Sequence, residues 1–138
     1  PGNLITTQKI KKELEKIPPD CDILLIRTGA ELWRNSSRND YTKKGVGIDL
    51  EVAKWIRENL NLKFLGLDFI SLSSPLHREI GHLAHKALLS RNESKKEPVL
   101  IIEDMKLNHL KQIPKEIIII PLLFEESDGS MVTIIGKI

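Results

Sequence analysis

The sequence contains a single cysteine, Cys21, so no disulfide can form within the chain. A lone thiol just before a strongly apolar run is more typical of a buried side chain than of a nucleophile. One cysteine also excludes a zinc ribbon, which needs several closely spaced thiolate or imidazole ligands. The chain must therefore hold itself together through its own core, and a reducing compartment suits it.

Long apolar runs are absent as well. No stretch approaches the roughly 18 apolar residues of a membrane span, and the polar, lysine-rich start does not resemble a secretory signal. We therefore expect no membrane association and a cytoplasmic protein. A large excess of positive or negative charge is also absent, because 21 Lys and Arg residues are balanced by 19 Asp and Glu residues, for a net charge of +2. This balance predicts solubility and no nucleic-acid partner.

Two common catalytic or binding motifs do not occur. The segment Gly45-Val46-Gly47 lacks the further glycine and the preceding strand of a dinucleotide-binding fingerprint. No G-x-S-x-G segment is present, so a serine nucleophile elbow is excluded. A small nucleotide-binding domain is accordingly disfavoured.

The patterns that are present predict an α/β protein. With 138 residues, of which 41% are hydrophobic, the chain can build a core of its own. Apolar runs within residues 22–26, 63–70 and 99–102 predict strands buried on both faces, by helices or by another domain. Helical spacing predicts helices from Thr6 or Thr7 to Ile17, from Asp49 to Asn59, and from Ser74 to about Leu89. Strand, helix and strand in this order imply parallel pairing.

The remaining segments complete the predicted fold. The polar stretch 30–47 predicts a surface loop, whose Trp33 and Tyr41 either cover a substrate pocket or pack on their own surface. The runs 117–123 and 131–135 flank a Ser-Asp-Gly-Ser turn and predict a β-hairpin that closes the sheet. We therefore predict a single α/β domain over residues 1–138, with a mixed, largely parallel β-sheet flanked by helices and a C-terminal β-hairpin.

Histidines and carboxylates are the candidates for chemistry. His82 and His85 lie three residues apart and share a helix face, which fits either metal ligation or two half-buried structural histidines. Glu103 ends an apolar strand, so it needs either a metal or an ion-pair partner such as Arg27. Asp68 raises the same question. Because parallel strands end at one edge of a sheet, a set of five residues is predicted to converge there: His85, Glu103, Asp68, Arg27 and Thr28.

Five segments, read in order, resemble the C-terminal part of the cyclase family of metal-dependent hydrolases, which includes kynurenine formamidase. They are Asp22–Gly29, Gly66–Ser71, Gly81–Leu89, Ile101–Leu107, and Pro121–Leu123 with the hairpin that follows. The resemblance implies a swivelling β/α/β-like fold. It also implies that His85 and Glu103 are ligands of a divalent metal, zinc or manganese, which accept such nitrogen and oxygen donors.

The resemblance extends to the other candidates. Arg27, Thr28, Asp68 and Ser71 are expected to bind substrate or to brace the pocket, and His82 is a catalytic or substrate-facing candidate. The family's H-x-G-T-H-x-D segment, which supplies two histidines and a bridging aspartate, does not occur in this sequence. Two protein ligands are fewer than the three typical of catalytic zinc, so we expect the chain alone to be inactive and the missing ligands to precede residue 1.

The implied activity is hydrolysis of a carbon–nitrogen bond in a small-molecule amide or cyclic amide. The competing hypothesis is a non-catalytic α/β interaction module, a remnant whose exposed strand edges work in a homo-oligomer. Absence of the H-x-G-T-H-x-D segment from the gene would favour this second hypothesis.

Overall fold

The computed structural model describes residues 3–92 and 94–138. The chain divides into two compact units, Pro1–Asn108 and His109–Ile138. The first unit contains the parallel part of the fold, and the second contains the C-terminal hairpin. The prediction of a single domain over the whole chain stays a prediction.

The elements alternate as the α/β prediction requires. In the first unit they are β1 (Leu4–Ile5), α1 (Thr7–Leu14), β2 (Ile23–Ile26), the 3-10 turn η1 (Ala30–Leu32), α2 (Trp33–Ser36), α3 (Arg38–Lys43), β3 (Gly47–Ile48), α4 (Leu50–Asn59), β4 (Phe64–Leu67), α5 (Arg78–Leu89) and β5 (Leu100–Ile102). The second unit contains β6 (Glu116–Pro121) and β7 (Val132–Lys137). Parallel strands, flanking helices and a C-terminal hairpin confirm the predicted fold class.

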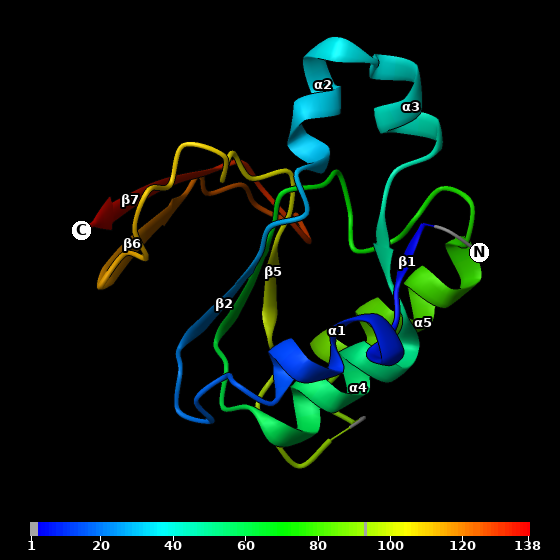
Figure 1. Ribbon diagram of the computed structural model, residues 1–138. Helices are drawn as coiled ribbons and strands as arrows, with labels where there is room; N and C mark the ends of the chain where they lie inside the picture. Colours follow the sequence, from blue (N-terminus) through cyan, green and yellow to red (C-terminus); the bar gives the residue numbers. More distant parts are fainter. Residues whose placement is uncertain (1–2, 93) are drawn as a thin grey trace. The chain divides into compact units, whose positions relative to one another are not determined.

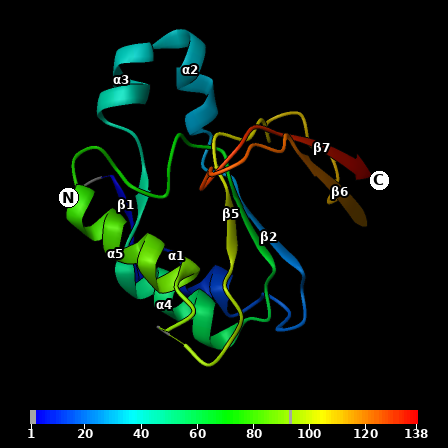
Figure 2. The ribbon, with the colours of Figure 1, turned by 180° about the vertical axis from the view of Figure 1, so that it is seen from behind.

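The main sheet of the first unit has three parallel strands in the order β2-β4-β5. The central strand β4 pairs on both sides, and its Leu65 and Leu67 are fully buried. Helices α1, α4 and α5 lie together on one side of this sheet, as both ribbon views show (Figures 1 and 2). The parallel pairing predicted from the strand, helix and strand order is confirmed.

The edge strand β2 is less buried than its sequence predicts. All four of its apolar residues are half-buried, although a continuous apolar run is typical of a strand covered on both faces. The reason is its position, because β2 is an edge strand of a sheet whose helices lie on one side (Figures 1 and 2).

Helices α4 and α5 form the main helical layer. Asp49 lies at the N-cap of α4 as predicted, and the inner stripe of α4 buries Val52, Ala53 and Ile56. The buried Arg57 donates hydrogen bonds to the backbone carbonyls of Leu88, Ser90 and Lys96. These carbonyls belong to the end of α5 and the turn after it, where helix carbonyls lack intrahelical partners. A basic residue of α4 thus caps the helix that carries His85.

Helix α5 begins four residues later than Ser74. The Ser74 hydroxyl donates to the carbonyl of Gly45 at 2.8 Å and accepts the N–H of Leu76 at 3.3 Å, so it stabilises a turn that precedes the helix. Within the helix Ala84 and Leu88 are buried, whereas their neighbour Leu83 is 46% exposed.

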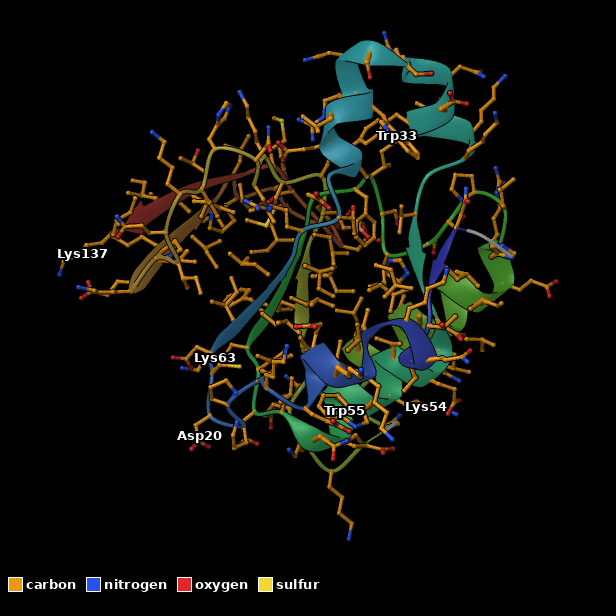
Figure 3. The ribbon with its side chains drawn as sticks, viewed as in Figure 1. Asp20, Trp33, Lys54, Trp55, Lys63 and Lys137 are labelled. Atoms are coloured by element: carbon orange, nitrogen blue, oxygen red, sulfur yellow. The ribbon has the colours of Figure 1, made fainter. Side chains whose placement is uncertain are left out.

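Residues 30–36 and 38–43 are helical, and the prediction of a surface loop from 30 to 47 is therefore wrong. We call this segment, which contains η1, α2 and α3, the helical arm. The Glu31 carboxylate in its first turn accepts the N–H groups of Leu107 and Asn108, a contact that local sequence patterns do not reveal. Trp33 lies on the arm, whereas Lys63 marks the opposite end of the sheet (Figure 3). Tyr41 is buried within the first unit.

Two short sheets differ from the predicted single sheet. Strands β6 and β7 pair antiparallel, with Ile118 opposite Ile135, so the predicted hairpin is confirmed. Within the described residues this hairpin forms a two-stranded sheet of its own and does not close the main sheet. Strands β1 and β3 form a parallel pair of two residues each, too short to produce a periodic pattern. In the described part of the chain, no helix is long and apolar enough to cross a membrane.

Candidate metal centre

The carboxyl ends of the strands in the main sheet carry the candidate residues. After β4 the chain enters residues 71–74, which we call the serine loop. Its position is fixed from β3, because Ile48 donates its N–H to the carbonyl of Leu72 at 2.8 Å. Gly47 of β3 approaches so closely that a Cβ atom there would lie 2.4 Å from the backbone nitrogen of Ser74. The glycine therefore permits β3 and the serine loop to pack backbone against backbone.

Glu103, directly after β5, is held by the serine loop. Its Oε1 accepts the hydroxyl of Ser71 at 2.9 Å and the N–H of Leu72 at 2.7 Å. Burial alone raises the pKa of the Glu103 carboxyl, but the hydrogen bonds from His85, Leu72 and Ser71 outweigh it and bring the pKa below its ordinary value. Glu103 is therefore an ionised carboxylate in a fixed orientation.

His85 reaches the same carboxylate from α5. Its Nδ1 lies 2.9 Å from the carbonyl of Gly81, one helical turn earlier. Because a carbonyl only accepts hydrogen bonds, Nδ1 must carry the proton, and the other ring nitrogen, Nε2, points to Glu103. Ser73 adds a contact, with its Oγ 3.3 Å from Nδ1. A metal-ligating histidine commonly has its other nitrogen fixed in this way.

The two facing atoms are spaced as metal ligands are. His85 Nε2 and Glu103 Oε1 lie 3.2 Å apart, with side chains 29% and 34% exposed. Two ligand atoms about 2.1 Å from one metal ion lie about 3.0–3.4 Å apart for coordination angles of about 90–110°. A charge-assisted hydrogen bond is typically shorter, about 2.7–2.9 Å. The observed spacing is compatible with a long hydrogen bond and with two ligands of one cation.

The electrostatics of the pair point the same way. The hydrogen bond to Glu103 raises the pKa of His85 above its ordinary value, even though burial opposes this shift. The carboxylate thus attracts positive charge to Nε2, and this charge can be supplied by a proton or by a divalent cation. The sequence predicted that Glu103 needs either a metal or an ion-pair partner. In the structure, the side chain in the position of such a partner is His85.

Asp68 has a different environment. It is fully buried, and its oxygens accept the N–H of Thr28 at 2.9 Å, the Thr28 hydroxyl at 2.7 Å and the N–H of Gly29 at 2.6 Å. Gly29 has a φ of 82°, a conformation that suits glycine, so the carboxylate fixes the sharp turn after β2. Of the two predicted roles for Asp68 and Thr28, bracing the site fits these contacts.

The remaining candidates lie nearer the solvent. His82 is exposed, although it shares α5 with the half-buried His85. Arg27 is also exposed and directly precedes Thr28. The structure thus brings His85, Glu103 and Ser71 into direct contact and joins Asp68 to Thr28. The catalytic role of His82 and the substrate-binding role of Arg27 stay predictions.

Three contributors to the site are absent from the predicted set. Leu72 acts through its backbone N–H, and Ser73 and Gly81 contact Nδ1 of His85. A Cβ atom on Gly81 would lie 2.5 Å or less from atoms of Ser73, so only glycine lets α5 approach the serine loop this closely. The cluster of serines after β4 is a sequence signal for the loop, but backbone donors and close helix approach have no such signal.

Among the described residues, no group of three or more His, Cys, Asp or Glu side chains is arranged to hold a metal ion. The described residues thus offer two side chains, His85 and Glu103, that could hold a divalent metal, and two are fewer than a catalytic zinc usually has. Their chemistry, one neutral imidazole nitrogen and one carboxylate oxygen, suits zinc or manganese.

Comparison with known families adds the decisive observation. A family model described as a putative cyclase matches residues 1–74, which is more than half of the 138 residues. This chain belongs to the cyclase family. The matched part of this cyclase-family chain includes Arg27, Thr28, Asp68 and Ser71, whereas His85 and Glu103 follow it. No curated protein and no solved structure matches the chain.

Proposed function

We propose that this cyclase-family chain contributes to a metal-dependent hydrolase that cleaves a carbon–nitrogen bond in a small amide or cyclic amide. The observation that carries the proposal is the 3.2 Å juxtaposition of His85 Nε2 and Glu103 Oε1. Both atoms are oriented by further hydrogen bonds and both side chains are partly open to solvent, as a site that must admit metal and substrate requires.

His85 and Glu103 would hold zinc or manganese. A metal held there would lower the pKa of a bound water and polarise the carbonyl of the amide. Ser71 and the N–H of Leu72 keep the Glu103 carboxylate ionised and in place, and the carbonyl of Gly81 keeps His85 Nε2 directed at Glu103. His82 and Arg27 are proposed to face the substrate, where an imidazole can move a proton and a guanidinium can bind a carbonyl or carboxylate.

The proposal is tested by metal content and then by activity. The protein is prepared with Zn²⁺ or Mn²⁺, its bound metal is quantified, and hydrolysis of N-formyl amides and cyclic amides is followed. We expect metal to bind to the unaltered chain and binding to weaken in His85→Ala and in Glu103→Ala. His109→Ala, which removes a histidine of the second unit, is the matched control. Failure of the chain to bind any divalent metal would overturn the proposal.

A second candidate function is a non-catalytic α/β module that works in a homo-oligomer. It is favoured by the half-buried apolar residues of the edge strand β2 and by Leu100 of β5, which is 53% exposed. Light scattering across a concentration series tests this candidate. It requires a stable oligomer and a metal content that does not change in His85→Ala, and a metal-dependent monomer would exclude it.

A further inference from the structure

The helical arm is fastened to the residue that follows Glu103. Arg34 Nη2 donates to the Oδ1 of Asp104 at 2.6 Å and to the backbone carbonyl of the same residue at 3.0 Å. The Tyr41 hydroxyl donates to the same Oδ1. The Arg34 guanidinium also lies over the Tyr41 ring, 5.6 Å from its centre, within the range of a cation–π contact. Two side chains of the arm thus converge on one residue at the end of β5.

Asp104 has an unusual backbone conformation, with a φ of 57°. Left-handed backbone is uncommon outside glycine and persists where surrounding contacts hold it. Here the N–H of Asp104 donates to the carbonyl of Phe69 at 2.9 Å, while Arg34 holds its carbonyl and its carboxylate. Asp104 and Glu103 share a peptide bond, so the contacts that hold the backbone of Asp104 also restrain the carboxyl-terminal side of the Glu103 backbone.

The contacts are specific to the residue types that make them. A guanidinium is a planar fork, and here one of its nitrogens reaches a backbone carbonyl and a carboxylate of a single residue. The Arg34 side chain is 35% exposed and that of Asp104 is 50% exposed, whereas Tyr41 is only 4% exposed as a residue. The buried Tyr41 side chain therefore packs against the half-exposed ion pair and restricts the motion of the Arg34 guanidinium.

We propose that Arg34 and Tyr41 are positioning residues of the metal centre: they hold Asp104 in its left-handed conformation and thereby orient Glu103 as a metal ligand. The inference rests on the proposed metal role of Glu103. The inference gives a function to the helical arm. The hydrogen bonds that orient His85 and Glu103 involve the serine loop and Gly81, and none of them involves the arm. Supporting residues of this kind commonly change metal affinity when they are replaced.

The test is a double-mutant cycle on the full chain. Zn²⁺ affinity is measured by calorimetry, and Co²⁺ is used as a spectroscopic substitute that reports coordination. We expect Arg34→Met to weaken Zn²⁺ binding about tenfold and to alter the Co²⁺ spectrum. Arg38→Met is the matched control, because it removes the same charge from an exposed position of the same arm, and we expect it to change neither measurement.

The decisive comparison is made in the Glu103→Ala background. If Arg34 acts through Glu103, Arg34→Met causes no further loss of affinity once Glu103 has been removed. An equal loss in both backgrounds, or no loss in either, overturns the positioning role and leaves the proposed function standing. If Glu103→Ala itself leaves Zn²⁺ affinity unchanged, the proposed function fails and the positioning role fails with it. If Arg34→Met does not fold, Tyr41→Phe, which removes a single hydroxyl, carries the same cycle with the same outcomes.

Discussion

The strands β4 and β5 are neighbours in one parallel sheet, and each is followed by a carboxylate at its carboxyl end. Asp68 after β4 is fully buried and receives hydrogen bonds from Thr28 and Gly29. Glu103 after β5 keeps a third of its side chain exposed and faces His85. Two acidic residues that occupy the same position relative to their strands thus have different environments.

These two environments distinguish a structural carboxylate from a candidate functional one. The donors around Asp68 come from one turn of backbone and its threonine, so the carboxylate is saturated by the fold and closed to a ligand. The donors around Glu103 hold the carboxylate in place, and its remaining neighbour is a titratable ring nitrogen at a spacing suited to a metal. Solvent access and the chemistry of the nearest partner distinguish the two sites, whereas strand position does not.

The largest expected effect is on folding at the β4 end. Asp68→Ala leaves the partly buried N–H groups of Thr28 and Gly29 without their acceptor, and an unsatisfied donor costs up to about 1–3 kcal/mol. We expect the free energy of unfolding to fall by about 3 kcal/mol in urea denaturation. Asp22→Ala is the control, because its ion pair with Lys63 is 70% exposed on both sides and contributes about 0.5 kcal/mol. Equal losses in the two variants would mean that Asp68 contributes no more to stability than an exposed ion pair does.

The second effect is on metal binding at the β5 end. Glu103→Gln keeps the size of the side chain but removes the charge that attracts a cation to His85 Nε2. We expect Zn²⁺ affinity to fall at least about tenfold while the free energy of unfolding changes by less than about 1 kcal/mol. Calorimetric titration and urea denaturation of the same sample measure both. A stability loss as large as that of Asp68→Ala would mean that the two carboxylates play the same structural role.

A third prediction concerns the contact between Tyr41 and Asp104. Asp104 lies beside Glu103, and its exposure of 50% is greater than that of Asp68 or Glu103. Burial and the hydrogen bond with Asp104 raise the pKa of Tyr41 above its ordinary value of 10.0. A raised pKa means that the folded state favours the neutral phenol, so this contribution to stability is present below pH 10.0 and is lost as pH rises through the folded pKa.

This titration can be measured directly, because Tyr41 is the only tyrosine in the chain. The ultraviolet absorbance of tyrosinate should show a midpoint above pH 10.0, and Asp104→Asn should bring the midpoint down. A midpoint at the ordinary value in the unaltered chain would contradict the contact between the helical arm and Asp104.

The smallest expected effect is at His82. His82 is exposed on α5, while His85 lies one turn from Gly81 and contacts Glu103. We expect His82→Ala to leave Zn²⁺ affinity within about twofold of the unaltered chain and His85→Ala to weaken it at least about tenfold. Calorimetry on the two variants decides this, and a comparable loss in both would make His82 a ligand.

Much of the fold follows from local sequence patterns. The apolar runs of β2, β4 and β5, the Asp49 cap of α4 and the turn at residues 127–130 each have a short-range signal, and the structure contains the corresponding elements. The helical arm lacks such a signal, because its helices depend on the contacts of Glu31, Arg34 and Tyr41 with residues more than 60 positions away. Contacts of that separation are invisible to periodicity.

The candidate site also has some features that local sequence patterns predict and others that they do not. Apolar periodicity and chain order suffice to place carboxylates after two buried strands and a histidine on the intervening helix. The contacts of Asp68 with a turn of backbone donors and of Glu103 with His85 arise from tertiary packing, because the partners of a charged group depend on which distant segments pack beside it. The burial of a carboxylate and the positions of its hydrogen-bond donors distinguish a structural carboxylate from a candidate ligand. Both are established only when the chain has folded.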